Sequence, residues 1–188
     1  MIETRSERLL LDRMVTPIGT AMLVTDAEGF LRAFDWSEFE PRLERLMRLQ
    51  IDREVDLSDG PAPAAIRAAV EDYFAGDLGR LDAIPCRTGG TPFQREVWTA
   101  LRTIPAGQTV SYAALAARIG RPRAVRAVGL ANGANPIGVV VPCHRVIGAD
   151  GTLTGYGGGL ERKRWLLAHE LQHAGGIVQT TLDFSAQR

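Results

Sequence analysis

Cys143 lies in the segment whose residue types are best suited to covalent chemistry, the sequence PCHRV at residues 142–146. The apolar, β-branched run at residues 137–141 comes directly before it and predicts a buried strand that ends at the cysteine. A histidine and an arginine follow Cys143, and nearby positive charge lowers the pKa of a thiol. A buried cysteine taken alone is usually inert packing. Cys143 is therefore a candidate nucleophile whose assignment depends on its surroundings.

Basic residues dominate the sequence around Cys143. The chain has a formal net charge of zero, yet residues 1–90 carry 11 arginines and 17 acidic residues, and residues 91–188 carry 11 basic and 5 acidic residues. A stretch of one charge sign attracts anions, and the commonest large polyanion is a nucleic acid. Nucleic acid is therefore the leading partner. Residues 97–149 contain no Asp or Glu but six arginines: Arg102, Arg118, Arg121, Arg123, Arg126 and Arg145.

Length and composition describe an ordinary folded protein. With 188 residues and 45% hydrophobic content, the chain can bury a core as one large domain or two small ones. It contains no apolar run of the roughly 20 residues that cross a bilayer, and its first residues lack the hydrophobic region of a signal peptide. Cys86 and Cys143 do not form the pattern of a secreted disulfide scaffold. We expect a cytoplasmic protein with reduced thiols and no membrane contact.

The first 88 residues predict a small α/β domain built on an antiparallel sheet. Residues 14–36 contain two extended runs separated by a glycine-containing turn, which indicates a hairpin. Ser37 and Glu40 have the spacing of a capping box at the start of an amphipathic helix. Two prolines open a second helix, which we expect to stop near Gly76.

Residues 89–174 predict a mostly helical second domain, which begins where the charge changes sign. Thr91 has capping-box spacing at the start of its first helix. Ser111 is placed to cap a short helix, and a glycine-containing turn joins this helix to another over residues 123–131, which is helix-turn-helix geometry. A last helix begins near Leu160. Residues 175–188 predict a loosely ordered tail. The fold class is α/β (α+β).

In six blocks the chain resembles the O6-alkylguanine-DNA alkyltransferases, and the order and spacing of the blocks fit the family. The likeness is densest from Phe93 to Glu170, and the N-terminal region is similar, more weakly, to the α/β domain of the stand-alone bacterial members. The blocks are FQREVW (93–98), RAVG (126–129), NP (135–136), PCHRV (142–146), GY (155–156) and WLLAHE (165–170).

The resemblance implies a chemical role for four residues. Cys143 would accept the alkyl group, because a poor electrophile requires a thiolate and an ordinary thiol with a pKa of ~8.5 is mostly protonated at neutral pH. His144 and Glu170 would help to deprotonate it, the histidine through a water molecule. Glu170 is otherwise out of place, since a carboxylate in the last turn of a helix opposes the macrodipole. Asn135 would be a structural hinge between the helix-turn-helix and the strand that ends at Cys143.

The resemblance also implies that the damaged base leaves the DNA stack to reach the cysteine. Arg126, on the second helix of the helix-turn-helix, would fill the gap, and Tyr112 would crowd the phosphate and contact the flipped base. The helix enters the minor groove in this family, and the small residues Ala127 and Gly129 suit a close approach. Arg121 and Arg123 would add phosphate contacts.

Tyr156, Gly157, Val146 and Pro142 would form the substrate pocket. Many family members carry serine after the loop tyrosine, whereas Gly157 stands there in this chain. A backbone N–H can still stabilise the leaving guanine O6, but the hydroxyl is absent. The resemblance implies no organic cofactor and no metal.

Two other functions compete with this interpretation. The sequence HELQH at residues 169–173 matches the zinc-hydrolase pattern HExxH, in which two histidines bind zinc and the glutamate acts as base. However, a third ligand is missing: Gln179 stands where the longer pattern has histidine, and Gly175 and Gly176 predict that the helix ends close to His173. The other competitor is a helix-turn-helix protein that binds lesions without removing them, and Cys143 argues against it.

We therefore expect irreversible transfer of an alkyl group from O6-alkylguanine in double-stranded DNA to Cys143, once per molecule. O4-alkylthymine is a second candidate substrate. Nothing in the sequence suggests a symmetric interface, so a monomer is expected, and cooperative assembly on DNA is left open.

Overall fold

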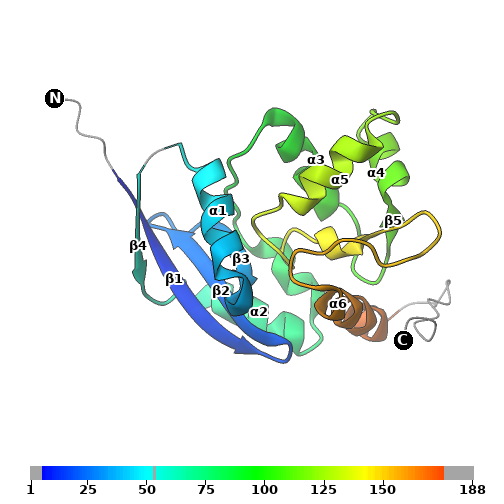
Figure 1. Cartoon of the computed structure of the whole chain (residues 1–188). Helices are drawn as coiled ribbons and strands as arrows, with labels where there is room; N and C mark the ends of the chain where they lie inside the picture. Colours follow the sequence, from blue (N-terminus) through cyan, green and yellow to red (C-terminus); the bar gives the residue numbers. More distant parts are fainter. Residues whose placement is uncertain (1–5, 53, 176–188) are drawn as a thin grey trace.

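The computed structural model describes residues 6–52 and 54–175, and its N-terminal part is built on one four-stranded sheet (Figure 1). The strand order is β3-β2-β1-β4. β1 pairs antiparallel with β2 and β2 with β3, whereas β4 pairs parallel with β1. The strands are β1 (Glu7–Thr16), β2 (Gly19–Asp26), β3 (Leu31–Trp36) and β4 (Val55–Asp59).

The predicted hairpin is confirmed as β2 and β3, but the sheet is mixed rather than purely antiparallel. β4 (Val55–Asp59) was not predicted, and four of its five residues are exposed. Such a polar strand can exist at a sheet edge, where only one side of it requires a hydrogen-bonding partner. β1 likewise begins at Glu7, well before the predicted hairpin.

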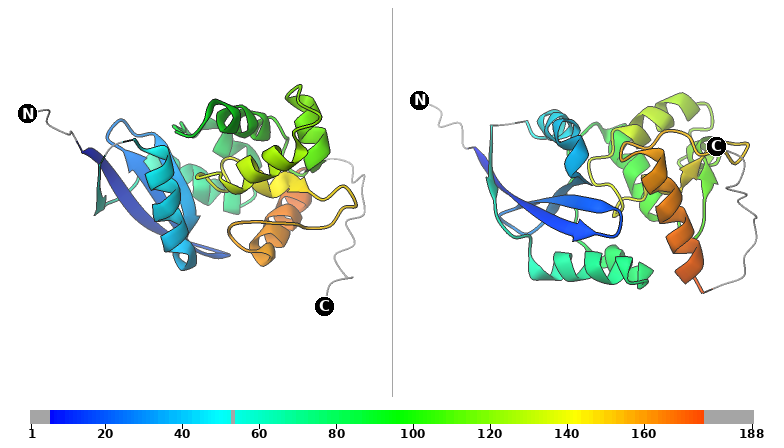
Figure 2. Two further views of the ribbon diagram at one scale, coloured as in Figure 1. Left: turned by 45° about the horizontal axis from the view of Figure 1, so that its top comes forward. Right: turned by 60° about the horizontal axis from the view of Figure 1, so that its bottom comes forward.

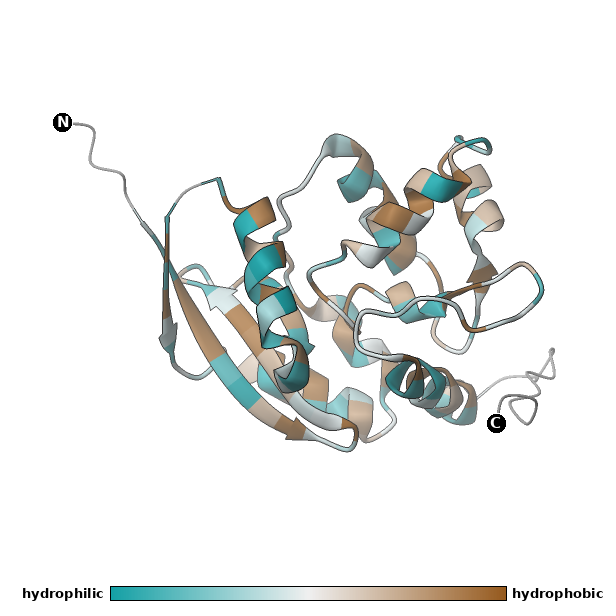
Figure 3. Ribbon diagram, viewed as in Figure 1, coloured by the Kyte–Doolittle hydropathy of each residue, from teal (hydrophilic) through white to brown (hydrophobic). Residues whose placement is uncertain are grey.

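Helices cover both faces of the sheet. In the right-hand view of Figure 2, α1 (Glu40–Gln50) and α2 (Ala64–Phe74) lie on opposite sides of it. β2 is buried on both faces. Met22 and Val24 pack in the hydrophobic cluster that contains Leu43 of α1. Ala21 and Leu23, on the other face, pack in the cluster that contains Ile66, Val70 and Tyr73 of α2. Figure 3 shows α1 mixing hydrophilic and hydrophobic positions, as a helix with one buried side must.

The predicted capping box at Ser37 and Glu40 is wrong. Ser37–Phe39 forms a 3₁₀ turn, η1, and α1 starts at Glu40, where no described side chain caps it. The Ser37 hydroxyl instead lies 3.4 Å from the Glu38 carboxylate. The second helix follows the prediction, since α2 begins directly after Pro63 and ends before Gly76, whose φ is 111°.

The C-terminal part is mostly helical, and its caps follow the sequence. Thr91 and Gln94 make both hydrogen bonds of a capping box, and Ser111 accepts a hydrogen bond from the Ala114 N–H. α4 and α5 form the predicted helix-turn-helix, although α5 starts at Val125 rather than at residue 123. The elements are η2 (Leu78–Ala83), α3 (Pro92–Arg102), β5 (Val110–Ser111), α4 (Tyr112–Arg118), α5 (Val125–Gly133), η3 (Cys143–Arg145), β6 (Val146–Ile147) and α6 (Leu160–His173).

The two parts of the chain share packing and hydrogen bonds. One hydrophobic cluster runs from Leu23 and Phe34 of the sheet to Val97 of α3, Val128 of α5 and Leu166 of α6. Phe34 also makes a backbone bridge to Ile137. The end of β3 therefore lies against the segment that leads to Cys143. A domain boundary between residues 88 and 89 stays a prediction, and residues 176–188 of the predicted tail lie outside the described residues.

No helix in the described ranges is both long and apolar enough to span a membrane.

Candidate active site

Cys143 opens the short 3₁₀ helix η3 rather than ending a strand. Residues 137–141, predicted as a buried strand, form a turn: the Val141 N–H donates to the Ile137 carbonyl at 2.9 Å, and Val139 has a φ of 65°. The apolar run is buried as expected, but buried backbone groups must also be hydrogen-bonded. Here their partners lie within the turn, on the Asn135 side chain and on the Phe34 carbonyl, which accepts from the Gly138 N–H at 2.9 Å. Burial alone therefore did not identify a strand.

Asn135 supplies the hydrogen bonds that hold this turn. Its Nδ2 atom donates to the Val141 carbonyl at 2.8 Å and to the Ile137 carbonyl at 3.4 Å, and its Oδ1 atom accepts from the Ile137 N–H at 3.0 Å. Asn132 of α5, which the sequence reasoning missed, donates to the Cys143 carbonyl at 3.4 Å. Two asparagines therefore fix the backbone on either side of the cysteine.

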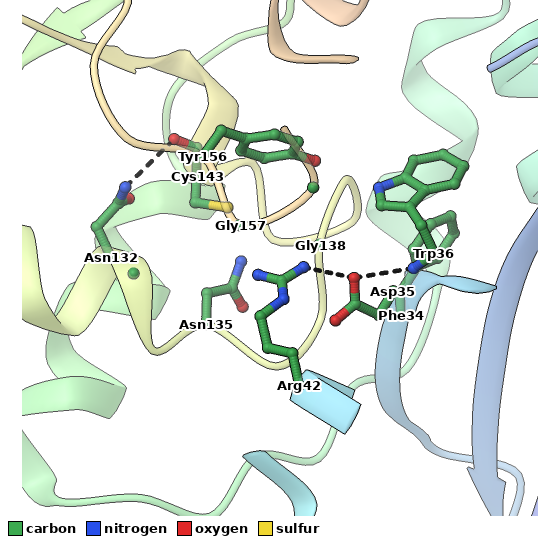
Figure 4. Close-up of a pocket in the computed structure, with 12 residues that line it drawn as sticks. Phe34, Asp35, Trp36, Arg42, Asn132, Asn135, Gly138, Cys143, Tyr156 and Gly157 are labelled. Atoms are coloured by element: carbon green, nitrogen blue, oxygen red, sulfur yellow. Dashed lines mark hydrogen bonds and ion pairs between the residues drawn. The ribbon is translucent and has the colours of Figure 1, made fainter. Parts of the chain in front are cut away.

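The pocket beside Cys143 is lined by three parts of the chain (Figure 4). Tyr156 and Gly157 come from the glycine-rich loop, and Asn132 and Asn135 come from α5 and the residues after it. The third part was not foreseen, because it belongs to the N-terminal region: Phe34, Asp35 and Trp36 of β3 and Arg42 of α1.

The thiol of Cys143 is not a resident low-pKa thiolate. Burial raises its pKa, and this outweighs the lowering effects of Asn135, Lys163 and Arg42. The sequence-based expectation, that adjacent His144 and Arg145 would lower it, is therefore wrong for the free protein. The physical reason is desolvation, which penalises the charged form of a group with 8% of its surface exposed.

Glu170 lies at the centre of a buried hydrogen-bond network. It is 0% exposed and accepts hydrogen bonds from the Tyr73 hydroxyl at 2.9 Å and from the Gly107 backbone N–H at 3.2 Å. Arg145 donates to both carboxylate oxygens, through Nε at 2.9 Å and Nη2 at 2.8 Å. Burial alone raises the pKa of Glu170, but His144 and Arg145 outweigh it and hold this pKa well below its usual range. Glu170 is therefore a carboxylate.

His144 is oriented by Glu170. Its Nε2 atom lies 2.8 Å from Glu170 Oε1, and because a carboxylate only accepts, Nε2 carries the hydrogen when the ring is neutral. Burial lowers the pKa of His144 despite the opposing effect of Glu170, which favours that neutral ring. Its Nδ1 atom is buried and has no partner among the described residues. The ring is thus arranged with its basic nitrogen free to accept a proton.

Arg145 and Tyr73 are the partners that sequence reasoning missed. Arg145 was counted among the anion-attracting arginines, but it is 6% exposed and also donates to the Ile104 carbonyl at 2.5 Å. Its charge is therefore used inside the protein. The basic surface has one arginine fewer than the six counted in residues 97–149. Arg145 directly follows His144, so its position in the sequence could have indicated that it also contacts Glu170. Nothing in the sequence connected Tyr73 of α2 with Glu170.

Lys163 links the cysteine segment to the glycine-rich loop. It is fully buried, and its Nζ atom donates to the Val146 carbonyl at 2.6 Å and to the Thr154 carbonyl at 2.7 Å. Burial lowers its pKa to about 8. The available signal was composition, because this is the one lysine in a chain with 21 arginines.

The residues predicted to contact DNA lie on or beside the helix-turn-helix. Arg126, Arg123 and Ala127 are exposed, while Gly129 is half-buried against the Tyr112 ring. Arg121 is exposed but ion-paired with Glu96 at 3.0 Å. Short parallel pairing of β5 with β6 places the start of α4, and so Tyr112, next to the strand that follows η3.

Four residues were predicted to form the substrate pocket. Tyr156 and Gly157 line the pocket beside Cys143. Pro142 and Val146 are buried at the two ends of η3, where they support the cysteine from within the fold.

The HExxH residues are engaged in packing. His169 Nε2 lies 2.8 Å from the Tyr73 carbonyl, and its ring stacks on Trp165 with centroids 4.7 Å apart. His173 Nδ1 lies 2.9 Å from the His169 carbonyl, and Glu170 points into the His144–Arg145 network. The described residues contain no cluster of three His, Cys, Asp or Glu side chains that could hold a metal. Gln179 and Gly176 lie outside the described residues. This arrangement does not support a zinc hydrolase.

Comparisons with known proteins identify the family of this chain. Residues 92–172 match the family model described as 6-O-methylguanine DNA methyltransferase, DNA binding domain. The chain is 52% identical over 164 residues to a methylated-DNA–protein-cysteine methyltransferase of Salmonella typhimurium, covering 87% of this chain and 96% of the relative. The structure is similar to the Mycobacterium tuberculosis O6-methylguanine methyltransferase, with a TM-score of 0.73, 40% identity and coverage of 90% and 96%. The chain belongs to the methylated-DNA–protein-cysteine methyltransferase family.

Proposed function

We propose that this protein repairs DNA by moving the alkyl group of O6-alkylguanine onto Cys143. The observation that carries this assignment is a buried cysteine that borders a pocket and is followed directly by a histidine hydrogen-bonded to a buried carboxylate. The chain is similar to relatives named for transfer to a protein cysteine, and to a Mycobacterium tuberculosis structure described as a complex with DNA (TM-score 0.68, 38% identity, coverage of 87% and 94%).

The reaction exchanges one bond for another. The Cys143 sulfur attacks the alkyl carbon, an S–C bond forms, and the C–O6 bond breaks with its electron pair left on guanine. The proton that the thiol loses is matched by the proton that the guanine gains, so the products are unmodified guanine and a thioether. A thioether has no easy route back to a thiolate, so each molecule acts once.

The site activates the thiol at the moment of reaction. Because burial raises the pKa of Cys143, the free protein holds a neutral thiol, which protects it from adventitious alkylation. His144 Nδ1 is a basic nitrogen that no described residue pairs with, and a bridging water lets it take the thiol proton. Glu170 remains a carboxylate throughout and stabilises the protonated ring.

Double-stranded DNA is bound through the helix-turn-helix, with Arg126 replacing the flipped base and Tyr112 near the rotated phosphate. Arg126 is exposed on α5, whose neighbouring Ala127 and Gly129 carry little bulk, so α5 can approach a minor groove closely. Arg123 is exposed and available to a phosphate, whereas Arg121 must first leave Glu96. A cytoplasmic, monomeric protein stays a prediction.

Intact and peptide mass spectrometry tests the proposal. The protein is mixed with a slight excess of duplex DNA that carries one O6-methylguanine. We expect one added methyl group per molecule, confined to the Cys143 peptide, absent in Cys143→Ala and retained in Cys86→Ala. Binding to the lesion without methyl transfer would instead assign a non-catalytic lesion-binding protein.

A further inference from the structure

Two side chains of the N-terminal region, Arg42 and Trp36, lie against the glycine-rich loop at the pocket. A Cβ atom added to Gly157 would overlap the Arg42 guanidinium, and one added to Gly158 would lie 2.6 Å from Trp36 Nε1 and 2.7 Å from the Tyr156 ring. The loop can approach this closely because both residues are glycine. Arg42 therefore occupies the space that a side chain at position 157 would take.

The Arg42 guanidinium is held in place, yet it retains unused donors. Its Nη2 atom is ion-paired with Asp35, which is 3% exposed and also accepts from the Trp36 backbone N–H at 2.8 Å. Its Nε atom is buried and meets no acceptor within the described part of the chain. Leaving a buried donor unpaired is unfavourable, because its lost contact with water is not replaced. Such a donor is available to an acceptor that enters the pocket.

Arg42 is also the only cationic residue among the described residues that line the pocket. Figure 4 shows its side chain extending from α1 toward the segment that carries Cys143, with Asp35 beside it. Its charge acts on the sulfur, because it is one of the groups that lower the pKa of Cys143 against the larger effect of burial. A planar hydrogen-bond donor held by Asp35 therefore lines the same pocket as Cys143.

We propose that Arg42 is a catalytic residue that donates a hydrogen bond to guanine O6 while the alkyl group moves to Cys143. This inference rests on the proposed function. O6 gains negative charge only as the C–O6 bond breaks, so a cationic donor favours the transition state over the bound substrate. A preorganised donor in a water-poor pocket acts more strongly than the same group in water. In this chain Arg42, from the N-terminal region, thus supplies the hydrogen-bond donor. It fits beside the loop because Gly157 has no side chain.

Four variants test the assignment: Arg42→Met, Arg42→Lys, Gly157→Ser and the double variant Arg42→Met/Gly157→Ser. Arg42→Lys keeps an ion pair with Asp35 and so guards against misfolding, but it lacks the second arm of the guanidinium. Arg45→Met is the control, because Arg45 is an exposed arginine on the same helix. Each protein is tested for the single-turnover rate of methyl transfer from O6-methylguanine DNA and for alkylation of Cys143 by neutral iodoacetamide across pH.

Arg42→Met and Arg42→Lys should slow methyl transfer ~10- to 100-fold, at or below the effect of removing one oxyanion donor, and Arg45→Met should not. Iodoacetamide alkylation should change much less, since its leaving group does not meet Arg42. Gly157→Ser should slow transfer when Arg42 is present and accelerate it in the Arg42→Met background.

A wild-type rate in both Arg42 variants would overturn the assignment. An equal loss of rate with methylated DNA and with iodoacetamide would also overturn it, because Arg42 would then act on the thiol alone. So would an unchanged rate of methyl transfer in Gly157→Ser when Arg42 is present. Failure of the proposed function is a separate result, in which the wild-type protein itself gains no methyl group.

Discussion

Replacing Glu170 by glutamine tests the energetic core of the site. The change keeps the shape of the side chain and removes its charge, which leaves Arg145 buried at 6% exposure beside an amide. Two Arg145 hydrogen bonds, at 2.9 and 2.8 Å, and the His144 contact at 2.8 Å then meet a partner that is itself partly a donor. Removing one member of a buried ion pair costs ~3–5 kcal/mol. Because whole domains are stable by only about 5–15 kcal/mol, we expect a large loss of stability.

Urea unfolding measures this loss as the change in the free energy of unfolding. The control is Glu161→Gln on the same helix, where the pair with Arg164 is at the surface and the Glu161 side chain is 91% exposed. Its effect should stay below about 1 kcal/mol. The double variant Glu170→Gln/Arg145→Met removes both charges, so it should be less destabilised than the sum of the single changes. A loss below 1 kcal/mol for Glu170→Gln, or strict additivity with Arg145→Met, would refute the reasoning.

The pH dependence of stability gives a second readout of the same change. A glutamate in the unfolded chain titrates near ~4.3. The pKa of Glu170 in the folded protein is well below that value. The stabilisation is therefore complete above the unfolded pKa and is lost as the pH falls toward the folded pKa. Glu170→Gln should reduce this acid sensitivity.

Three further predictions concern the turn, the thiol and the DNA surface. Asn135→Ala removes the donor to the Val141 carbonyl at 2.8 Å and the acceptor of the Ile137 N–H at 3.0 Å. It should lower the free energy of unfolding in urea by about 2–4 kcal/mol and slow methyl transfer. An unchanged transfer rate would show that the turn does not position the cysteine. Iodoacetamide alkylation of Cys143 should keep accelerating above pH ~8.5, the ordinary thiol pKa, because burial raises the pKa of this thiol; a plateau at lower pH would contradict the resting neutral state. Arg126→Ala should slow methyl transfer more than it weakens binding to undamaged duplex, whereas Arg123→Ala should chiefly lower the salt slope of affinity, by ~1; equal effects from both would remove the base-replacing role from Arg126.

Local patterns were read correctly where a few neighbouring residues decide the structure. Thr91 and Ser111 cap their helices as expected, because capping depends on residues within one turn. The prediction failed at Ser37, whose hydroxyl has a competing partner in Glu38, and at residues 137–141. In that run, apolar composition established burial, but Asn135 decided that the backbone would bond locally as a turn.

The sequence by itself indicated the candidate cysteine with its adjacent histidine, the helix-turn-helix and the family. Each of these is carried by residues that lie close together or in ordered blocks. Only the tertiary structure decided the electrostatic state of Cys143, because burial depends on every segment packed around it. Tertiary structure also decided that Arg145 binds Glu170 rather than DNA, and that Arg42 reaches the pocket from a helix about a hundred residues away in the chain. Hydrogen bonding and desolvation act over a few ångströms of space, and sequence separation carries no information about such distances.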